Sequence, residues 1–367
     1  MITAAASFWR KGFPSVLVAV GGIVLSGLIL EVALRLAGRG PFVSQAPQIT
    51  SEPGAVLCPH PQLGLALRPG SYTVQINEGL SYHCQHQPDS TRYCGPGPTG
   101  AAAPVLALYG CSLTYGMGVD DTTTFAYQLQ RALPHWKVRN YGVPAYGTIQ
   151  SYLQLRQQLA AGVRPTIVLL HYTALHDARN KLSPVQQKYW REAFQKIPLD
   201  EVTTWQKARF PHLPKVATSP LDIRWLALAD MPQRWTASQH LASSQAIETL
   251  VDHIYDSFQA KSLISQRLLC AFAALCREAE IPLLVVGMTQ DRATASTLRY
   301  ARQTGISTLD PAVDLAAAAY NLQPFDSHPN GLAHRAYTRA ILRTLRDLQW
   351  VSSPSVLPRF SQQEWRK

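Results

Sequence analysis

Short apolar runs alternate with amphipathic stretches between residues 104 and 348, and this alternation limits the fold more than any other feature of the sequence. Short apolar strands separated by amphipathic helices are typical of a parallel sheet with helices on both faces. We therefore predict an α/β fold of three α/β/α layers, with the active site at the carboxyl ends of the strands. The expected strands cover 105–109, 138–141, 166–170, 281–286 and 305–309. The expected helices cover 125–133, 149–160, 263–278 and 332–348.

The composition is that of a globular protein. Of the 367 residues, 46% are hydrophobic and 16% are charged, which supplies enough apolar side chains for a full core. The formal net charge of +11 favours acidic surroundings such as anionic lipid headgroups or an acidic polysaccharide. No Lys/Arg block or basic helical repeat occurs, so we expect no nucleic-acid partner. No His/Cys spacing resembles a zinc motif, and we expect neither a metal nor an organic cofactor.

One apolar segment near the N-terminus predicts a membrane anchor. Residues 12–30 carry no charge, and such a run is long enough to cross a hydrocarbon core of roughly 30 Å. It is too long for the core of a signal peptide, so we expect an uncleaved anchor, with a cleaved signal or a buried helix as alternatives. Basic residues flank both ends, and the short N-terminal tail is expected in the cytoplasm. We predict a single-pass protein of the cytoplasmic (inner) membrane, with tail and anchor at 1–39 and the rest periplasmic.

The remaining segments divide the chain further. Residues 40–103 are rich in Pro, Gly, Ser and Gln and predict a linker followed by a small irregular or β-rich subregion, with one strand at Ser71–Ile76. The main domain is expected at 104–350. An insert within it, at about 181–245, contains four of the eight tryptophans and predicts a lid, although plain packing explains any single tryptophan as well. Residues 351–367 form a C-terminal tail.

The six cysteines fall into two groups. Cys58, Cys84 and Cys94 follow the anchor, where an oxidising compartment would allow two of them to join, and buried free thiols are an equal alternative. Cys270 and Cys276 lie in an apolar stretch and are expected in the core face of a helix.

A serine follows the first core strand on a glycine-flanked turn, in Gly110-Cys-Ser-Leu-Thr-Tyr-Gly116. This is the position expected of an exposed nucleophile at the carboxyl end of a strand. A serine hydroxyl needs a general base and donors for the developing oxyanion, so Ser112 alone has no chemical meaning. A serine in such a loop is also a common turn or cap residue.

A base and a carboxylate occur near the end of the chain, in Asp326-Ser-His-Pro-Asn-Gly-Leu-Ala-His334. An imidazole can take the proton of the serine, and a carboxylate can orient the imidazole and stabilise its charged form. We prefer His328 to His334 because His328 lies in the turn, whereas His334 already lies in helical sequence. The predicted catalytic residues are therefore Ser112, His328 and Asp326.

Four segments together resemble the SGNH (GDSL-like) hydrolases, and in particular their membrane-anchored and polysaccharide O-acetylation relatives, over residues 104–348. They are the serine turn, Asn140-Tyr-Gly-Val-Pro-Ala-Tyr-Gly147, Leu170-His-Tyr-Thr-Ala-Leu-His-Asp-Ala-Arg-Asn180 and Asp326-Ser-His-Pro-Asn330. The resemblance implies an SGNH/flavodoxin-like fold and a serine esterase or acyltransferase. The two-residue step from Asp to His is shared with alginate-acetyltransferase-like members, which favours an acetyl group on a carbohydrate.

The resemblance also implies an oxyanion hole. Its three donors are the N–H of Ser112, the N–H of Ala145 and the side chain of His176. Two of these depart from the family, which has Gly in place of Ala145 and usually Asn in place of His176. A lost oxyanion donor costs about a hundredfold or more in rate, so the histidine bears on catalytic power.

Three further residues of the third segment are candidates for substrate binding, and a structural role at the end of the strand is slightly favoured for them: Asp177, Arg179 and Asn180. Cys111 stands where the family often has Asp. As a nucleophile it is disfavoured, because its side chain is expected to point away from that of the neighbouring serine.

The function predicted from these observations is transfer or removal of an acyl group on a carbohydrate through an acyl-Ser112 intermediate. Two other functions are kept open. One is a lipase or thioesterase acting on membrane acyl chains, suggested by the anchor and the tryptophan-rich insert. The other is a catalytically silent fold that binds glycan or assists assembly, suggested by the two departures in the oxyanion hole. The expected partners are an acyl-ester or carbohydrate substrate, the membrane and an undetermined membrane protein.

Overall fold

The computed structural model describes the chain in several ranges, which are 2–41, 48–60, 63–100, 102–180, 240–247, 250, 261–310 and 313–351. The predicted lid at 181–245 therefore lies outside the described residues except at its last positions, as does the tail at 352–367. The chain divides into two compact units. The first comprises Met1–Ala46 and Thr218–Gln259, and the second comprises Pro47–Ala217 and Ala260–Lys367.

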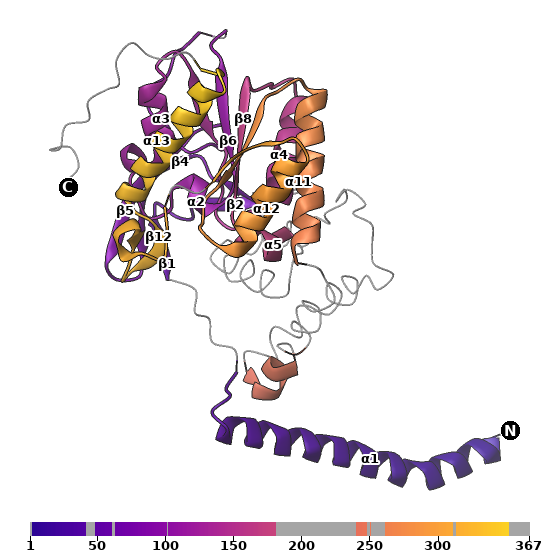
Figure 1. The fold of residues 1–367 in the computed structure, drawn as a ribbon. Helices are drawn as coiled ribbons and strands as arrows, with labels where there is room; N and C mark the ends of the chain where they lie inside the picture. The colour runs from indigo at the N-terminus through magenta and orange to yellow at the C-terminus, as the bar shows by residue number, and fades with distance from the viewer. Residues whose placement is uncertain are drawn as a thin grey trace. The chain divides into compact units, whose positions relative to one another are not determined.

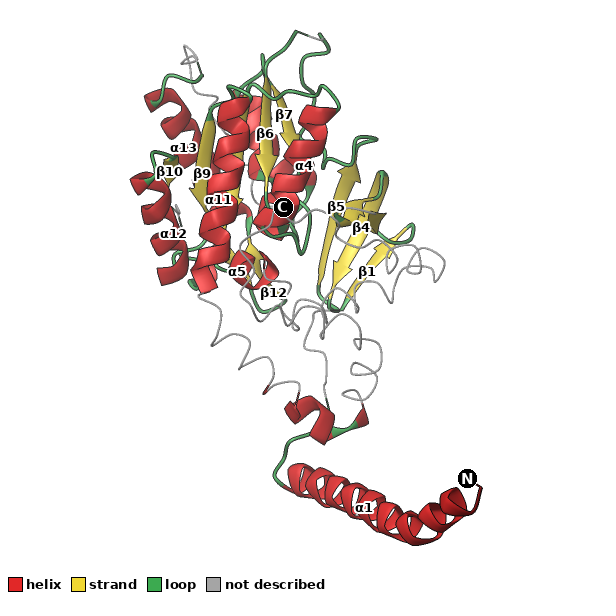
Figure 2. Cartoon of the chain, turned by 90° about the vertical axis from the view of Figure 1, so that its right-hand side faces the viewer, coloured by secondary structure: helices red, strands yellow, loops and turns green. Residues whose placement is uncertain are grey.

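A five-stranded parallel sheet forms the centre of the second unit, as predicted (Figures 1 and 2). The first core strand, β6, lies between the second and the third, which gives the flavodoxin-like order 2-1-3-4-5. The order of the strands along the chain therefore reverses between β6 and β8, and in open α/β sheets ligands commonly bind at the carboxyl ends of the strands beside such a reversal. Across the sheet the strands are β7 (Lys137–Asn140), β6 (Val105–Tyr109), β8 (Ile167–Tyr172), β9 (Leu283–Gly287) and β10 (Ser307–Leu309).

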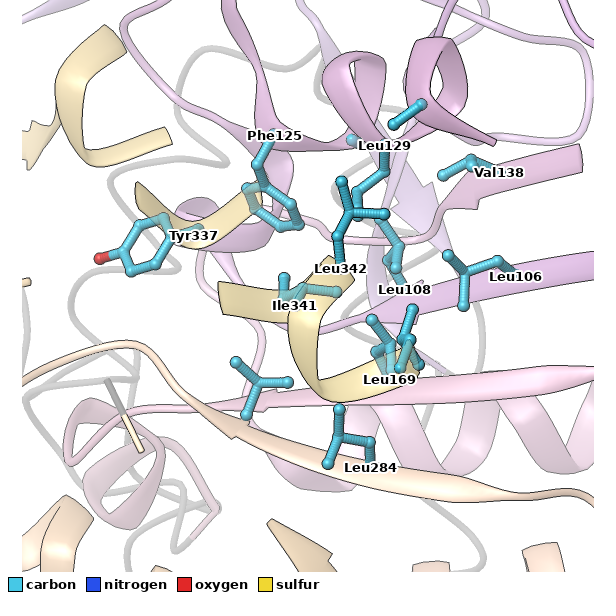
Figure 3. Close-up of a cluster of buried hydrophobic side chains, with 14 of the residues drawn as sticks. Leu106, Leu108, Phe125, Leu129, Val138, Leu169, Leu284, Tyr337, Ile341 and Leu342 are labelled. Atoms are coloured by element: carbon cyan, nitrogen blue, oxygen red, sulfur yellow. The ribbon is translucent and has the colours of Figure 1, made fainter. Parts of the chain in front are cut away.

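Helices cover both faces of this sheet, because alternate side chains of each strand are apolar on both sides. Leu106 and Leu108 belong to one core cluster, together with side chains of α3 and α13 (Figure 3). Ala107 and Tyr109, which alternate with them, belong to a second cluster with side chains of α4, α11 and α12. Figure 1 shows the two groups of helices on opposite sides of the strands. The helices are α3 (Phe125–Ala132), α13 (Gly331–Asp347), α4 (Thr148–Ala160), α11 (Lys261–Glu278) and α12 (Arg292–Gln303).

The segment expected to be a linker followed by a small irregular or β-rich subregion, with one strand, has five strands among its described residues. A three-stranded antiparallel sheet has the order β1-β4-β5, and β2 pairs with β3. The single-strand prediction was wrong because the buried positions of β5 are Tyr82, Cys84 and His86, which carry little of the apolar signal of a strand. The strands are β1 (Ile49–Glu52), β2 (Leu57–His60), β3 (Gly64–Leu67), β4 (Gly70–Ile76) and β5 (Leu80–His86).

This N-terminal sheet belongs to the same compact unit as the parallel sheet. Its buried side chains, among them Val74 and Ile76, form one core cluster with Tyr115 and Met117, which follow the serine turn, and with Tyr146 of the second segment. The sheet therefore helps to support the loops in which the catalytic residues were predicted.

The first unit contains α1 (Ile2–Leu36), which extends the predicted apolar run at both ends. Within it, Val18–Leu36 has a mean hydropathy of 1.9 and is long and apolar enough to cross a membrane. A signal sequence would have the same properties.

The end of α1 is bonded to a segment more than two hundred positions later in the chain. The carboxylate of Glu31 accepts hydrogen bonds from the N–H groups of Ala242 (2.9 Å) and Ser243 (2.8 Å) and from the Ser243 hydroxyl (2.7 Å). Arg35 pairs with the same carboxylate at 2.7 Å and donates to the carbonyl of His240 at 2.9 Å. The charged side chains near the end of α1 thus have hydrogen-bond partners within their own unit.

All six cysteines lie among the described residues, and all are free thiols. For Cys58, Cys84 and Cys94 the structure therefore favours the free-thiol alternative. Cys276 is buried against the sheet on α11, and Cys270 is half-buried on the same helix.

Candidate active site

The serine turn begins at the carboxyl end of β6, the first strand of the parallel sheet. Gly110 follows the strand with φ +155°, and a Cβ there would lie 2.1 Å from the Thr114 hydroxyl, so only glycine fits. Ser112 is the first residue of the one-turn helix α2 (Ser112–Tyr115) and is 5% exposed. The hydroxyl is thereby presented at the edge of the sheet where the strand order reverses.

The second half of the site comes from a hairpin near the end of the chain. The strand β12 (Asp326–Pro329) pairs with β11 (Asn321–Leu322) and leads directly into α13. Asn330 caps that helix by accepting from the N–H groups of its first turn, and its amide donates to two carbonyls of the preceding loop. The strand that contains His328 is therefore fixed by its pairing with β11 and by the Asn330 cap that follows it.

The three residues predicted to be catalytic form one hydrogen-bonded chain. His328 Nε2 lies 2.8 Å from Ser112 Oγ, and His328 Nδ1 lies 2.7 Å from Asp326 Oδ1. The same carboxylate oxygen accepts from the backbone N–H of His328 at 3.2 Å. This geometry puts the acceptor nitrogen of the imidazole at the serine and its N–H at the carboxylate, as general-base activation requires.

Asp326 is suited to remain charged in this arrangement. Burial alone would raise the pKa of its carboxyl, but the hydrogen bonds and the charge of His328 hold that pKa below its usual value. The side chain is 6% exposed, so water screens the pair only weakly. An ionised Asp326 fixes the tautomer of His328 and stabilises the imidazolium that forms when the serine loses its proton.

The second predicted segment lies beside the serine turn. The Asn140 amide donates to the carbonyl of Thr114 in α2 at 2.9 Å, and the N–H of Val143 donates to the carbonyl of Gly110 at 3.2 Å. Ala145 is buried with φ +71°, a left-handed conformation that is uncommon for residues other than glycine. Alanine thus occupies a position whose backbone favours glycine, the residue that the resemblance to SGNH hydrolases leads us to expect there.

His176 lies on α5 (Leu175–Asn180), directly after β8. It is fully buried, and its Nδ1 lies 3.1 Å from the hydroxyl of Thr148 at the start of α4. Its Nε2 is buried and has no hydrogen-bond partner among the described residues. Burial, with the nearby charges of Arg179 and His171, holds its pKa well below the usual value, so the imidazole is neutral.

The three residues considered for substrate binding are bonded to other parts of the protein. Asp177 accepts from Tyr172 OH at 2.5 Å and from the Ser265 hydroxyl. Arg179 donates to the carbonyl of Tyr146 at 3.0 Å. Asn180 accepts from the N–H of Ile149 at 3.1 Å and donates to Ser265 at 2.9 Å. These contacts hold the second segment and α11 against the end of β8.

The two disfavoured candidates lie away from the serine hydroxyl. His334 is buried on α13, where it stacks on Phe125 and its Nδ1 accepts from the Phe125 N–H at 3.2 Å. The Cys111 side chain is buried in the core cluster between α3, α13 and the sheet. Within the part of the chain that the structure describes, no group of three or more His, Cys, Asp or Glu side chains is arranged to hold a metal ion.

One buried residue beside the serine turn was missed from the sequence. Arg92 lies between β5 and β6 in the sequence and donates to carbonyls at the end of α2 and in the turn after it. A single arginine in a Pro- and Gly-rich segment carries no signal of such a role, because three of its partners are backbone carbonyls, which have no sequence pattern.

Comparisons with known proteins give distant similarities only. No family model matches the sequence, and no curated protein matches it. Among solved structures, the chain is similar to a lipolytic G-D-S-L family protein from Veillonella parvula, with 10% identity, a TM-score of 0.36, and coverage of 66% of this chain and 99% of that one. It is also similar to the esterase EstA from Pseudoalteromonas sp., with 13% identity, a TM-score of 0.36, and coverage of 66% of this chain and 98% of that one. A third similar structure is AlinE4, an SGNH-hydrolase family esterase, with 14% identity, a TM-score of 0.33, and coverage of 68% of this chain and 98% of that one.

Proposed function

We propose that this chain is a serine hydrolase of the SGNH type that cleaves or transfers an ester-linked acyl group. The observation that carries the proposal is the unbroken chain from Ser112 through His328 to Asp326, with distances of 2.8 and 2.7 Å. A buried serine, a partly buried imidazole and a buried carboxylate in this order activate an oxygen nucleophile and have no comparable use in merely packing a fold.

The mechanism follows from these contacts. His328 Nε2 takes the proton of the Ser112 hydroxyl while Oγ attacks the carbonyl carbon of the ester. The negative oxygen of the tetrahedral intermediate is received by the N–H groups of Ser112 and Ala145 and by the His176 imidazole. As the bond between the carbonyl carbon and the leaving oxygen breaks, His328 gives its proton to the leaving alcohol, and the acyl group remains on Ser112 Oγ. Water or another hydroxyl, deprotonated in turn by His328, releases the acyl group.

For the substrate we propose an acetyl group carried by a carbohydrate. The support is the resemblance of the last segment to alginate-acetyltransferase-like proteins and a net charge of +11, which suits an acidic polysaccharide. Release to water makes the protein an esterase, and release to a sugar hydroxyl makes it an acetyltransferase. The two outcomes differ only in how well water is excluded from the acyl-enzyme.

We further propose that α1 is an uncleaved membrane anchor and that the catalytic unit lies outside the cytoplasm. The length and mean hydropathy of Val18–Leu36 support a spanning helix. The hydrogen bonds from Ala242 and Ser243 to Glu31 support an anchor that stays attached, since a cleaved signal would leave those donors without their acceptor. We therefore propose that the protein binds the membrane through α1. We also propose a membrane protein as a second partner.

The test is turnover of a small activated acetyl ester by the full-length chain in detergent, compared with Ser112→Ala and His328→Ala. Both variants should lose turnover by several orders of magnitude, because neither the nucleophile nor its base can be replaced by a neighbour. Ser327→Ala, which alters a serine one position from the base, is the control. Wild-type protein without turnover, or an active Ser112→Ala variant, would refute the proposal.

One observation favours a catalytically silent fold as a second candidate. The Nδ1 of His176 is engaged with Thr148 and the imidazole is fully buried, so the third oxyanion donor is not the flexible amide usual in the family. A His176→Asn variant separates the two candidates. Faster ester turnover in this variant is expected of an enzyme with a weakened oxyanion hole, whereas a silent fold would gain nothing.

A further inference from the structure

Arg92 is a buried cation beside the serine turn for which the proposed mechanism has no use. Its side chain has no exposed surface, and its backbone N–H donates to the carbonyl of Asn140 at the end of β7. A charge buried to this extent persists only where several partners match it. The positions of those partners therefore show which segment the hydrogen bonds of the Arg92 guanidinium stabilise.

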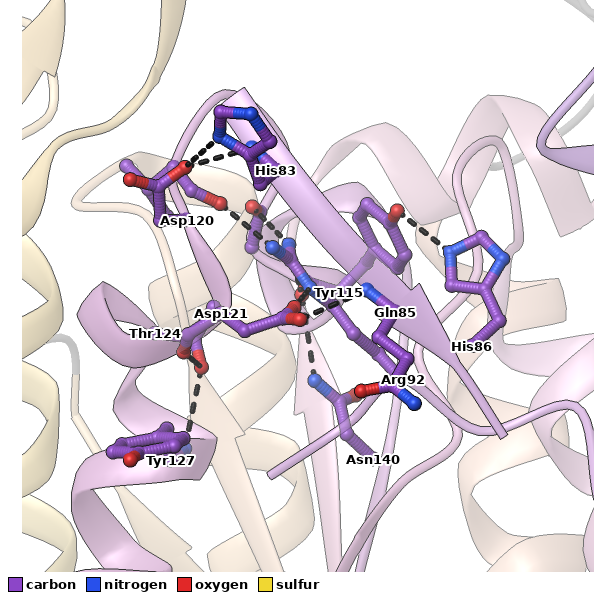
Figure 4. Close-up of polar contacts among 12 residues, drawn as sticks. His83, Gln85, His86, Arg92, Tyr115, Asp120, Asp121, Thr124, Tyr127 and Asn140 are labelled. Carbon is purple, nitrogen blue, oxygen red and sulfur yellow. Dashed lines mark hydrogen bonds and ion pairs between the residues drawn. The ribbon is translucent and has the colours of Figure 1, made fainter. Parts of the chain in front are cut away.

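Three of its partners are backbone carbonyls at the end of α2 and in the turn after it. Nη1 donates to the carbonyls of Tyr115 (3.0 Å) and Gly116 (2.5 Å), and Nη2 donates to that of Val119 (2.7 Å). Nε donates to the carboxylate of Asp121 at 2.7 Å. Figure 4 shows the guanidinium of Arg92 between Tyr115 and Asp121.

The carbonyl of Tyr115, the last residue of α2, is one that a short helix leaves unsatisfied, and those of Gly116 and Val119 lie in the turn that follows it. The last carbonyls of any helix have no partner within it, and α2 is a single turn. The carbonyl of Ser112 accepts from the N–H groups of Gly116 (2.9 Å) and Met117 (3.1 Å). Arg92 therefore binds the same turn that fixes the backbone of the serine.

Gly116 ends α2 and lies close to the guanidinium of Arg92. It has φ +88°, the left-handed conformation that ends a helix. A Cβ at this position would lie 3.2 Å from Arg92 Nη1 and 2.7 Å from the Thr124 methyl group. The turn therefore closes around the guanidinium only because residue 116 is glycine.

On its other side, Arg92 is connected to the N-terminal sheet. Asp121 lies in a short 3-10 helix, Asp121–Thr123, and its second oxygen accepts from the N–H of Gln85 in the edge strand β5 at 2.8 Å. The ring of Tyr115 lies over the guanidinium, 4.5 Å from its carbon, and Tyr115 OH bonds to His86 Nε2 at 2.8 Å (Figure 4). The sheet thus supports the serine turn through one buried arginine.

We propose that Arg92 is a positioning residue for the nucleophile. By holding the carbonyls that follow α2, it fixes the turn in which the Ser112 hydroxyl lies within hydrogen-bond distance of His328. A lysine would keep the charge opposite Asp121 but lacks the planar fork that reaches three carbonyls at once. The expected effect on rate rests on the proposed serine hydrolase function, whereas the ordering of residues 112–119 does not.

The test compares Arg92→Lys with Arg139→Lys in the full-length chain. Arg139 makes a half-exposed ion pair with Asp89 at 3.7 Å and serves as the matched control. Arg92→Lys should lower kcat by about tenfold to a hundredfold, the effect expected of a small misplacement of the nucleophile, with KM within about twofold of wild type. Amide hydrogen exchange over residues 112–119 should also become faster. Arg139→Lys should change neither kcat nor the rate of amide hydrogen exchange over residues 112–119.

A second variant guards against failure to fold. Millimolar guanidinium ion should restore part of the kcat of Arg92→Ala by occupying the vacated site, while methylammonium should not, because it lacks the planar set of donors. A purely structural role predicts a lower melting temperature with kcat per folded molecule unchanged in Arg92→Lys, and that result would overturn the proposal. If the wild type itself shows no turnover, the proposed function fails, and unchanged exchange over residues 112–119 in Arg92→Lys would then overturn the positioning role by itself.

Discussion

At the scale of single residues, Asp326 acts in the proposed mechanism without touching the reacting atoms. Its carboxylate accepts from His328 Nδ1 and so leaves Nε2 free to accept the serine proton. An amide in its place can donate to Nδ1 and impose the opposite tautomer. Asp326→Asn should therefore lower kcat by about four orders of magnitude, a loss of the size seen when such a carboxylate is replaced. Asp310→Asn, which alters an exposed ion pair, should leave kcat unchanged.

Steady-state turnover of the activated acetyl ester measures this effect. A fall in kcat of less than tenfold in Asp326→Asn would mean that the carboxylate does not orient the base.

Four buried histidines make the stability of the fold depend on pH. Burial lowers the pKa of His86 and of His171 to about 4, that of His334 to about 3, and that of His176 well below its usual value. The unfolded chain binds protons at these groups near pH 6.5, whereas the folded chain does not until the pH is far lower. The free energy of unfolding is therefore highest above pH 7 and falls as the pH drops from 6.5 towards 4. Each histidine contributes up to roughly 1.4 kcal/mol per pH unit.

Urea unfolding of the full-length chain at several pH values between 7.5 and 4.5 measures this dependence. His171→Asn should flatten the slope, since it removes one buried imidazole. His83→Asn should not, because the side chain of His83 is 76% exposed. Equal slopes in wild type and His171→Asn would contradict the linkage.

At the scale of elements, the N-terminal sheet belongs to the same compact unit as the parallel sheet. Ile76 of β4 is fully buried in the cluster that contains Tyr115. Ile76→Ala should lower the free energy of unfolding by about 2–5 kcal/mol through lost burial and the cavity that remains. Thr73→Ala on the exposed face of the same strand should cost far less. Both sheets should unfold in one transition, and a separate earlier transition of the N-terminal sheet would contradict this description.

The strand β8 was predicted and the strand β5 was missed because only β8 has a continuous run of apolar residues. Every position of β8 is buried, so its apolar run Ile167–Tyr172 is visible without any knowledge of its neighbours. The strand β5 has a polar and aromatic sequence, and its buried face is defined only by its pairing with β4.

The same difference applies to the candidate site. Ser112 and the Asp326–His328 pair lie in local motifs whose spacing is readable, although their meeting across 216 positions is a product of the fold. Arg92 was not predictable, because three of its partners are backbone carbonyls, and every residue has one.

At the scale of the whole molecule, the account depends on α1 being retained. A cysteine at each of positions 31 and 243, replacing Glu31 and Ser243, should be joined by a short bis-maleimide, since these side chains are in contact. The pair Val18 and Ser243 should not be joined, because Val18 lies about 20 Å further along the helix axis. The half-exposed thiols of Cys58 and Cys270 are first replaced by serine. Absence of the first link, or a mature chain that begins after α1, would contradict an anchor bound to the inserted segment.

The proposed function depends above all on the identity of the nucleophile. Treatment of the full-length chain with a fluorophosphonate, followed by peptide mass spectrometry, locates the reactive oxygen. The expected result is a single adduct on Ser112 that is absent after denaturation and in His328→Ala, since His328 accepts the serine proton. An adduct on any other residue, or none at all, would contradict the proposed function.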